Sequence, residues 1–123
     1  MSVPPPSAGA KSPALKIPAL RSSAPVFAAI GDETRLRLIA VLCAGGAMSI
    51  AQLTSGTQIT RQAVTKHLQV LADAGLVRDV KSGRERLWEF ELARLDEARQ
   101  SLETIAQQWD HALMQLQRAV EEP

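Results

Sequence analysis

Five polar side chains recur along residues 60–74 at a spacing that places them on one face of a helix. Their positions follow the intervals i, i+1, i+4, i+5 and i+8, and no acidic residue is among the five. Arginine, lysine, glutamine and threonine can donate hydrogen bonds to phosphates and to the edges of bases. We therefore predict a face that binds double-stranded DNA, made of Arg61, Gln62, Thr65, Lys66 and Gln69.

Two further residues of this segment belong to the predicted DNA-binding set. Thr60 precedes the helix as its N-cap, and the free N–H groups beside it suit a phosphate. His67 has two expected roles, packing against the protein or contacting a phosphate. Gln62 and Thr65 are short enough to lie over base edges, and glutamine can pair with adenine through two hydrogen bonds.

A second basic cluster follows at the tip of a predicted hairpin. Residues 76–80 and 87–90 are typical of two short strands, and the turn between them includes Gly83. We expect this wing to lie against the DNA backbone or in the minor groove, with a solvated basic turn as the alternative. The residues assigned to this contact are Lys81, Ser82, Arg84 and Arg86.

A helix-turn-helix must hold these side chains in place. The second helix has an apolar stripe at i, i+4 and i+7, formed by Val64, Leu68 and Leu71. A short helix over residues 49–55 opens with the spacing of a capping box. Residues 25–90 therefore predict a winged helix-turn-helix, mainly α with a small β-hairpin wing.

Two more helices are predicted upstream. Pro25 suits a helix start, Gly31 suits a stop, and Asp32 is a good N-cap for the next helix. We expect Cys43, the one cysteine of the chain, to be a small buried apolar residue and not a metal ligand. Met48 is expected to add a short edge strand to the later hairpin. The predicted buried stripe of the second helix is Leu36, Ile39, Ala40 and Cys43.

Residues 91–123 predict one long helix with an apolar seam of heptad type. A helix of roughly 28 residues is about 42 Å long, so one small domain does not cover the whole seam. We predict a homodimer with two-fold symmetry, and the alternative is that the helix packs only on its own domain. The predicted interface residues are Phe27, Leu95, Leu102, Ile105, Trp109, Leu113 and Leu116.

Composition and charge limit the class of protein. Residues 1–24 are rich in Pro, Ser and Ala, which predicts a disordered tail or, as the alternative, a basic arm along DNA phosphates. The net charge of +1 conceals a basic segment, residues 60–86, with six cations against three acids. Because no apolar run reaches the length of a membrane span and no signal peptide is recognisable, we expect a soluble cytoplasmic protein.

Three sequence blocks together resemble the ArsR/SmtB family of winged-helix transcriptional repressors. They are GDETRLRLI, RQAVTKHLQVLADAGLV and GRERLWEF, in this order within about residues 26–90. The resemblance implies a homodimer that binds an inverted-repeat operator and blocks transcription. The family's metal sites do not carry over, because the helix IAQLTS has no cysteine or histidine and Asp110 and His111 are adjacent. We therefore predict a branch with no metal site and no cofactor.

Other functions remain as alternatives at this point. An enzyme is not expected, because no Ser/His/acid set, phosphate loop or carboxylate pair occurs at a useful spacing. A metal-responsive ArsR-type repressor is the first alternative, and a winged-helix module that docks an acidic protein is the second. The sequence does not identify the operator, an effector, or whether the protein represses or activates.

Overall fold

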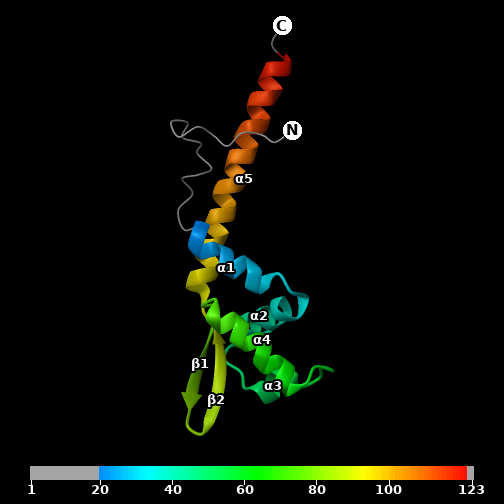
Figure 1. Ribbon diagram of the computed structural model, residues 1–123, viewed down its shortest axis with the longest axis vertical. Coiled ribbons are helices and arrows are strands. Elements are labelled where there is room, and N and C mark those ends of the chain that lie inside the picture. Colours follow the sequence, from blue (N-terminus) through cyan, green and yellow to red (C-terminus); the bar gives the residue numbers. More distant parts are fainter. Residues whose placement is uncertain (1–19, 122–123) are drawn as a thin grey trace.

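A computed structural model of the 123-residue chain describes residues 20–121. A body of short helices and one hairpin carries a long final helix that projects away from it (Figure 1). The predicted fold class, mainly α with a small β-hairpin wing and a long C-terminal helix, is confirmed. The elements are α1 (Leu20–Ile30), α2 (Glu33–Gly45), α3 (Ile50–Thr54), α4 (Arg61–Asp73), β1 (Val77–Ser82), β2 (Glu85–Phe90) and α5 (Leu92–Glu121).

Side chains just before α2, α3 and α4 cap these helices. Asp32 and Thr60 each accept a hydrogen bond from the backbone N–H of the third helical residue, at 3.0 and 3.1 Å. Ser49 and Gln52 form a reciprocal capping box at the start of α3. These contacts satisfy N–H groups that have no partner within the helix. The caps predicted from the sequence are confirmed.

The wing is an antiparallel pair, β1 and β2, joined by a tight turn. Gly83 lies in this turn with a φ of 63°, a conformation that residues with a Cβ rarely adopt. Met48 forms an isolated bridge with Trp88 through two backbone hydrogen bonds of 2.9 and 2.7 Å. The expected edge contribution from Met48 is therefore confirmed, and it ties the segment after α2 to the wing.

Helix α1 begins earlier than predicted, at Leu20, and Pro25 lies inside it. Ser23 is buried, and its hydroxyl oxygen is 3.2 Å from that of Ser101 on α5. Packing against α5 outweighs the helical hydrogen bond that Pro25 cannot donate. The prediction of a tail over residues 1–24 is therefore wrong for residues 20–24, and residues 1–19 lie outside the described part of the chain.

The predicted buried stripe of α2 is wrong at three of its four positions. Leu36, Ala40 and Cys43 are exposed, and Leu36 retains 52% of its accessible surface. The residues that α2 buries are Leu38, Ile39 and Leu42. Apolar residues occur on both sides of this helix, so its periodicity fits either face and contacts with neighbouring elements decide between them.

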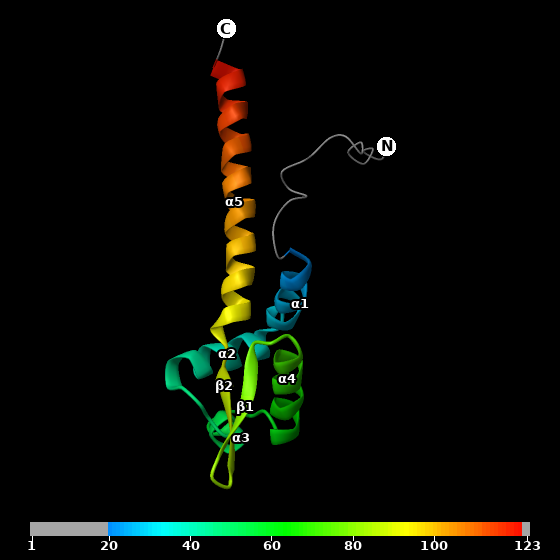
Figure 2. The same cartoon turned by 90° about the vertical axis from the view of Figure 1, so that its left-hand side faces the viewer.

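The core gathers around α4. Val64, Leu68 and Leu71 have no accessible surface, which confirms the apolar stripe predicted for this helix. Leu76 and Trp88 from the hairpin region and Ala98 from α5 complete the centre of the cluster. Beyond Gln108, every described residue of α5 is exposed, and this half of the helix extends away from the body (Figures 1 and 2). Within residues 20–121, no helix is long and apolar enough to span a membrane.

Candidate nucleic-acid interface

The predicted polar face of α4 is a continuous exposed surface. Its five residues are all exposed, and an open hollow lies among the four that belong to the N-terminal half of the helix. The opposite side of α4 is the buried stripe, which fixes the direction in which this polar face points. The structure therefore brings together Arg61, Gln62, Thr65, Lys66 and Gln69.

The hydrogen-bonding capacity of this face is concentrated near its N-terminal end. Gln69 donates to the carboxylate of Asp73 at 3.0 Å, and the Thr65 hydroxyl donates to the backbone carbonyl of Arg61 at 2.8 Å. The side chains of Arg61, Gln62 and Lys66 have no hydrogen bond or ion pair with another described residue. These three side chains are the donors available to a ligand.

The start of α4 adds backbone donors to the same region. Thr60 uses its hydroxyl oxygen to cap the N–H of Ala63. The N–H groups of Arg61 and Gln62 precede the first intrahelical bond and have no partner within residues 20–121. A helix N-terminus also carries a partial positive charge. Backbone and side chains at this end of α4 therefore favour an anion.

His67 lies on a different side of α4, facing the start of α2. Its Nδ1 is 4.0 Å from the carboxylate of Asp32 and 3.4 Å from the guanidinium of Arg35, and the side chain is half-buried. The backbone N–H of Arg35, followed by the charges on Arg35 and His67, holds the pKa of Asp32 below its ordinary value. This position fits the packing role expected for His67 better than the phosphate contact.

The basic residues of the wing fall into two groups. Near the base of the wing, Arg78 pairs with Glu89 and Glu91. Nearer the tip, Arg86 is opposite Lys81 in the register and donates to Asp79 at 2.7 Å. Arg86 also lies over the ring of Trp88, 5.1 Å from its centroid. The positive charges of Arg78 and Arg86 are therefore compensated within the chain.

The second group of polar residues, at and beside the turn of the wing, has no such compensation. Lys81, Ser82 and Arg84 are exposed, and their side chains make no ion pair or hydrogen bond with the described residues. In Figure 2, the wing tip and the N-terminal end of α4 lie at the same end of the molecule, opposite the free end of α5. The two parts of the chain that carry the uncompensated donors thus lie at one end of the molecule.

The predicted interface residues divide between the body and the projecting helix. Phe27 and Leu95 are half-buried and pack against the core of their own chain. The other five are exposed along α5, with Trp109 retaining 64% of its surface. The exposed members of this seam are Leu102, Ile105, Trp109, Leu113 and Leu116.

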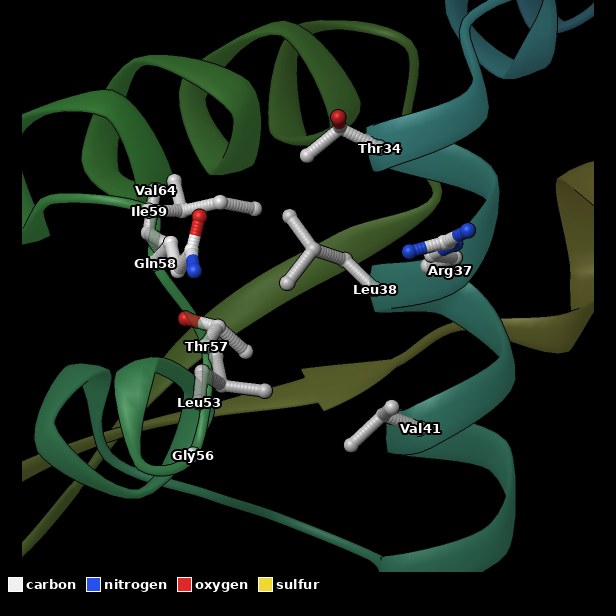
Figure 3. Close-up of a pocket in the computed structure, with 10 residues that line it drawn as sticks. All are labelled: Thr34, Arg37, Leu38, Val41, Leu53, Gly56, Thr57, Gln58, Ile59 and Val64. Carbon is white, nitrogen blue, oxygen red and sulfur yellow. The ribbon is translucent and has the colours of Figure 1, made fainter.

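The sequence did not point to a pocket that lies between α2 and the turn of the helix-turn-helix (Figure 3). Its lining residues come from α2, α3, the turn and α4, so no single stretch carries a recognisable pattern. Thr34, Gln58 and Ile59 are among those that sequence reasoning missed. Over residues 20–121, no three His, Cys, Asp or Glu side chains are grouped so that they could hold a metal ion.

The chain is similar to known regulators over much of its described length. Residues 30–80 match the helix-turn-helix domain family. The structure of an ArsR-like transcriptional regulator from Rhodococcus sp. RHA1 is 35% identical, with a TM-score of 0.74 over 84% of this chain and 96% of that chain. An uncharacterized HTH-type transcriptional regulator, YuzN of Bacillus subtilis, is 38% identical over 71 residues, covering 53% of this chain and 77% of the relative. The arsenical resistance operon repressor of Bacillus subtilis is 31% identical over 64 residues, covering 52% of this chain and 61% of the relative.

These similarities agree with the arrangement of α4 and the wing. A helix with exposed donors beside a basic hairpin tip is the geometry with which a winged helix-turn-helix binds DNA. The relatives are regulators and not enzymes, in agreement with the expectation from the sequence. The chain belongs to the ArsR family of winged helix-turn-helix transcriptional regulators.

Proposed function

We propose that this regulator is a homodimeric repressor that binds an inverted-repeat operator in the cytoplasm, where the chromosome is accessible to it. The observation that carries the proposal is the set of uncompensated cations at one end of the molecule. Arg61 and Lys66 belong to the N-terminal half of α4, and Lys81 and Arg84 flank the turn of the wing. The start of α4 and the wing tip lie at the same end of the molecule (Figure 2). Cations that are already paired within the chain contribute less to phosphate binding, so this end is the one that suits DNA.

In the proposed complex, the N-terminal half of α4 enters the major groove. Gln62 and Thr65 belong to the exposed polar face of α4, and their side chains are short enough to contact base edges. The amide of Gln62 can pair with adenine. Arg61 and Lys66 reach guanine or phosphate, and the free N–H groups at the helix start bind a phosphate. Sequence preference therefore depends chiefly on the first half of the helix.

The wing contributes affinity that does not depend on the base sequence. Lys81, Ser82 and Arg84 contact the sugar–phosphate backbone or the minor groove beside the α4 site. Arg86 contributes less, because its guanidinium is held by Asp79 and by the ring of Trp88. Gln69 is likewise held by Asp73 and lies at the edge of the contact.

The projecting half of α5 supplies the dimer interface. Leu102, Trp109 and Leu116 recur at heptad spacing and remain exposed in the single chain, as do their neighbours in the seam. Pairing this seam with that of a second copy buries it and relates the two α4 helices by a two-fold axis. Two recognition helices about 34 Å apart contact successive turns of one DNA face, which matches an inverted repeat.

Repression is the expected outcome of such binding. A dimer seated on an operator within a promoter blocks access of RNA polymerase to the same DNA. One relative is named a repressor of the arsenical resistance operon, which supports this direction of control. The proposal includes neither a metal nor a cofactor, and it leaves the identity of an effector to experiment.

An electrophoretic shift and a nuclease footprint with DNA from upstream of the protein's own gene test the proposal. We expect two protected half-sites one helical turn apart. Lys66→Glu should abolish the shift, whereas Arg118→Glu, the same charge change on exposed α5, should leave it intact. Failure to bind any upstream duplex at low salt would refute the proposed DNA binding. It would favour the alternative that the winged helix docks an acidic protein.

Metal dependence is tested on the same complex. Zn(II) and As(III) are added separately to the protein bound to its upstream DNA, with EDTA as the control. We expect the shift to be unchanged by either metal. Release of the DNA by one of them would instead identify the protein as a metal-responsive repressor.

A further inference from the structure

A pocket of about 450 Å³ opens between α2 and the turn that joins α3 to α4 (Figure 3). Leu38 and Val41 of α2 form one wall, and Leu53 of α3 and Ile59 of the turn form the other. Its volume lies within the range of roughly 300–1,000 Å³ that is usual for small-molecule sites. The pocket is distinct from the polar face of α4 and from the seam of α5.

We propose that this pocket binds a neutral, mainly apolar small molecule with one amide or hydroxyl group, and that binding is coupled to DNA affinity. The coupling rests on the proposed function, whereas the binding of the ligand does not. The apolar lining, the unpaired polar groups and the position of the turn each support one part of the proposal.

The lining favours an apolar ligand body. Leu38 and Leu53 are buried except for 5% of their surface, while Val41 at the rim retains 44%. Protein interiors are usually packed without voids larger than a water molecule, so an opening of this size beside the core is a place where a ligand gains contacts. Burial of the Val41 side chain would add to the favourable free energy.

Two polar side chains on opposite sides of the pocket specify the hydrogen-bonding group. Thr34 extends from α2, and Gln58 extends from the turn toward the same space (Figure 3). Neither side chain forms a hydrogen bond with another residue in the described part of the chain. A hydroxyl and an amide both donate and accept, so together they suit an amide or hydroxyl of the ligand.

The charge at the rim favours a neutral ligand. Arg37 is the one cation that lines the pocket, and its guanidinium donates to Glu33 at 2.7 Å. This ion pair on exposed side chains leaves the rim without an unbalanced charge. A carboxylate ligand would have to compete with Glu33 for Arg37, whereas a neutral amide would not.

The turn provides the connection to DNA binding. Gly56 to Ile59 line the pocket, and Ile59 directly precedes the N-cap of α4. A ligand that contacts both α2 and this turn favours one separation between them, and that separation sets how Arg61 and Gln62 face the groove. A ligand shifts this equilibrium only if it binds the two arrangements unequally, and the effect is then reciprocal between ligand and DNA.

A methyl-detected NMR titration of the full chain tests the binding, with benzamide and hexanamide as neutral aromatic and aliphatic amides. We expect saturable shifts at Leu38, Leu53 and Ile59. Val41→Trp fills the pocket from its exposed rim and should abolish them. Leu36→Trp is the matched control, because Leu36 is exposed on α2 but does not line the pocket.

Two results would overturn the proposal. Shifts that are absent with both amides, or that persist in Val41→Trp, would show that the pocket does not bind this class of ligand. With the upstream DNA, saturating amide should change the Kd by at least about 5-fold in the wild type and not in Val41→Trp; an unchanged Kd would overturn the coupling. Because the titration needs no DNA, failure of the pocket and failure of DNA binding are distinguished.

Discussion

Replacement of Trp109 by aspartate should convert the proposed dimer into a monomer. Trp109 lies in the middle of the α5 seam and retains 64% of its accessible surface in the single chain. In the proposed dimer, it is an anchor that the second chain buries. The substitution removes this apolar surface and adds a charge beside Asp110, so it acts on association and not on the fold of the chain.

The size of the effect follows from the exposed area. An aromatic side chain buries roughly 150–250 Å², so the exposed share of Trp109 is about 100–160 Å². At about 25 cal/mol per Å², this share contributes about 2.5–4 kcal/mol per chain. Two-fold symmetry doubles the contribution to about 5–8 kcal/mol, and loss of even the lower value weakens dimerisation by more than about three orders of magnitude.

Light scattering and sedimentation equilibrium measure the outcome directly. The wild type should have twice the 13.3 kDa mass of the chain, and Trp109→Asp should have the mass of one chain. Gln107→Asp is the control, because it introduces the same residue two positions away, on the opposite face of α5. A dimer of unchanged affinity in Trp109→Asp would refute the assignment of this seam as the interface.

Further predictions concern the specificity and affinity of DNA binding, the contribution of the core to stability, and the pH dependence of stability. Gln62→Ala should relax sequence preference at one base pair by about 1–3 kcal/mol in competition shifts; unchanged preference would remove Gln62 from base contact. Arg84→Ala should weaken binding to all sequences and reduce the salt slope of the dimer by about 2, because each of the two chains loses one phosphate contact; an effect confined to the operator would contradict a backbone contact. Leu68→Ala should lower the free energy of unfolding by about 2–5 kcal/mol, whereas Val70→Ala on the exposed side should change it by less than about 0.5 kcal/mol, both by urea unfolding. A backbone N–H holds the pKa of Asp32 below 3.8, so Asp32 stabilises the fold above that pH, and this stability is lost as pH falls through the lowered value. Asp32→Asn keeps a capping oxygen without titrating, so its urea midpoint should fall less than that of the wild type between pH 7 and pH 3.

Features that depend on a few neighbouring residues could be predicted from the sequence. The caps at Asp32 and Thr60 act within one helical turn, and the turn at Gly83 needs only its own backbone conformation. The polar face of α4 was predictable for the same reason, because one helix carries both this face and the buried stripe opposite it. The proposed DNA-binding surface is thus largely encoded in one continuous stretch.

Features that depend on distant contacts could not be predicted in this way. The start of α1 is set partly by the contact between Ser23 and Ser101, whose positions differ by 78 in sequence. Apolar residues on both sides of α2 left its orientation open until Leu38 and Leu42 were seen to face the other helices. The ion pair of Arg86 with Asp79 depends on the register of the wing, which the spacing of charges alone does not give.

The proposed function links dimerisation to DNA binding, because one chain has few uncompensated cations. At the end of the molecule that we propose faces DNA, the uncompensated cations among the described residues are Arg61, Lys66, Lys81 and Arg84. If each neutralises one phosphate, the slope of log K against log salt is about −4 for one chain and about −7 for two. A single chain should therefore bind weakly, while two chains joined through α5 bind at a much higher effective concentration. Trp109→Asp should consequently halve the salt slope and weaken operator affinity, although Trp109 belongs to α5, whose free end lies opposite the wing tip (Figure 1). A Trp109→Asp monomer with the wild-type slope would show that one chain supplies the entire contact, and the proposed two-fold operator would then be wrong.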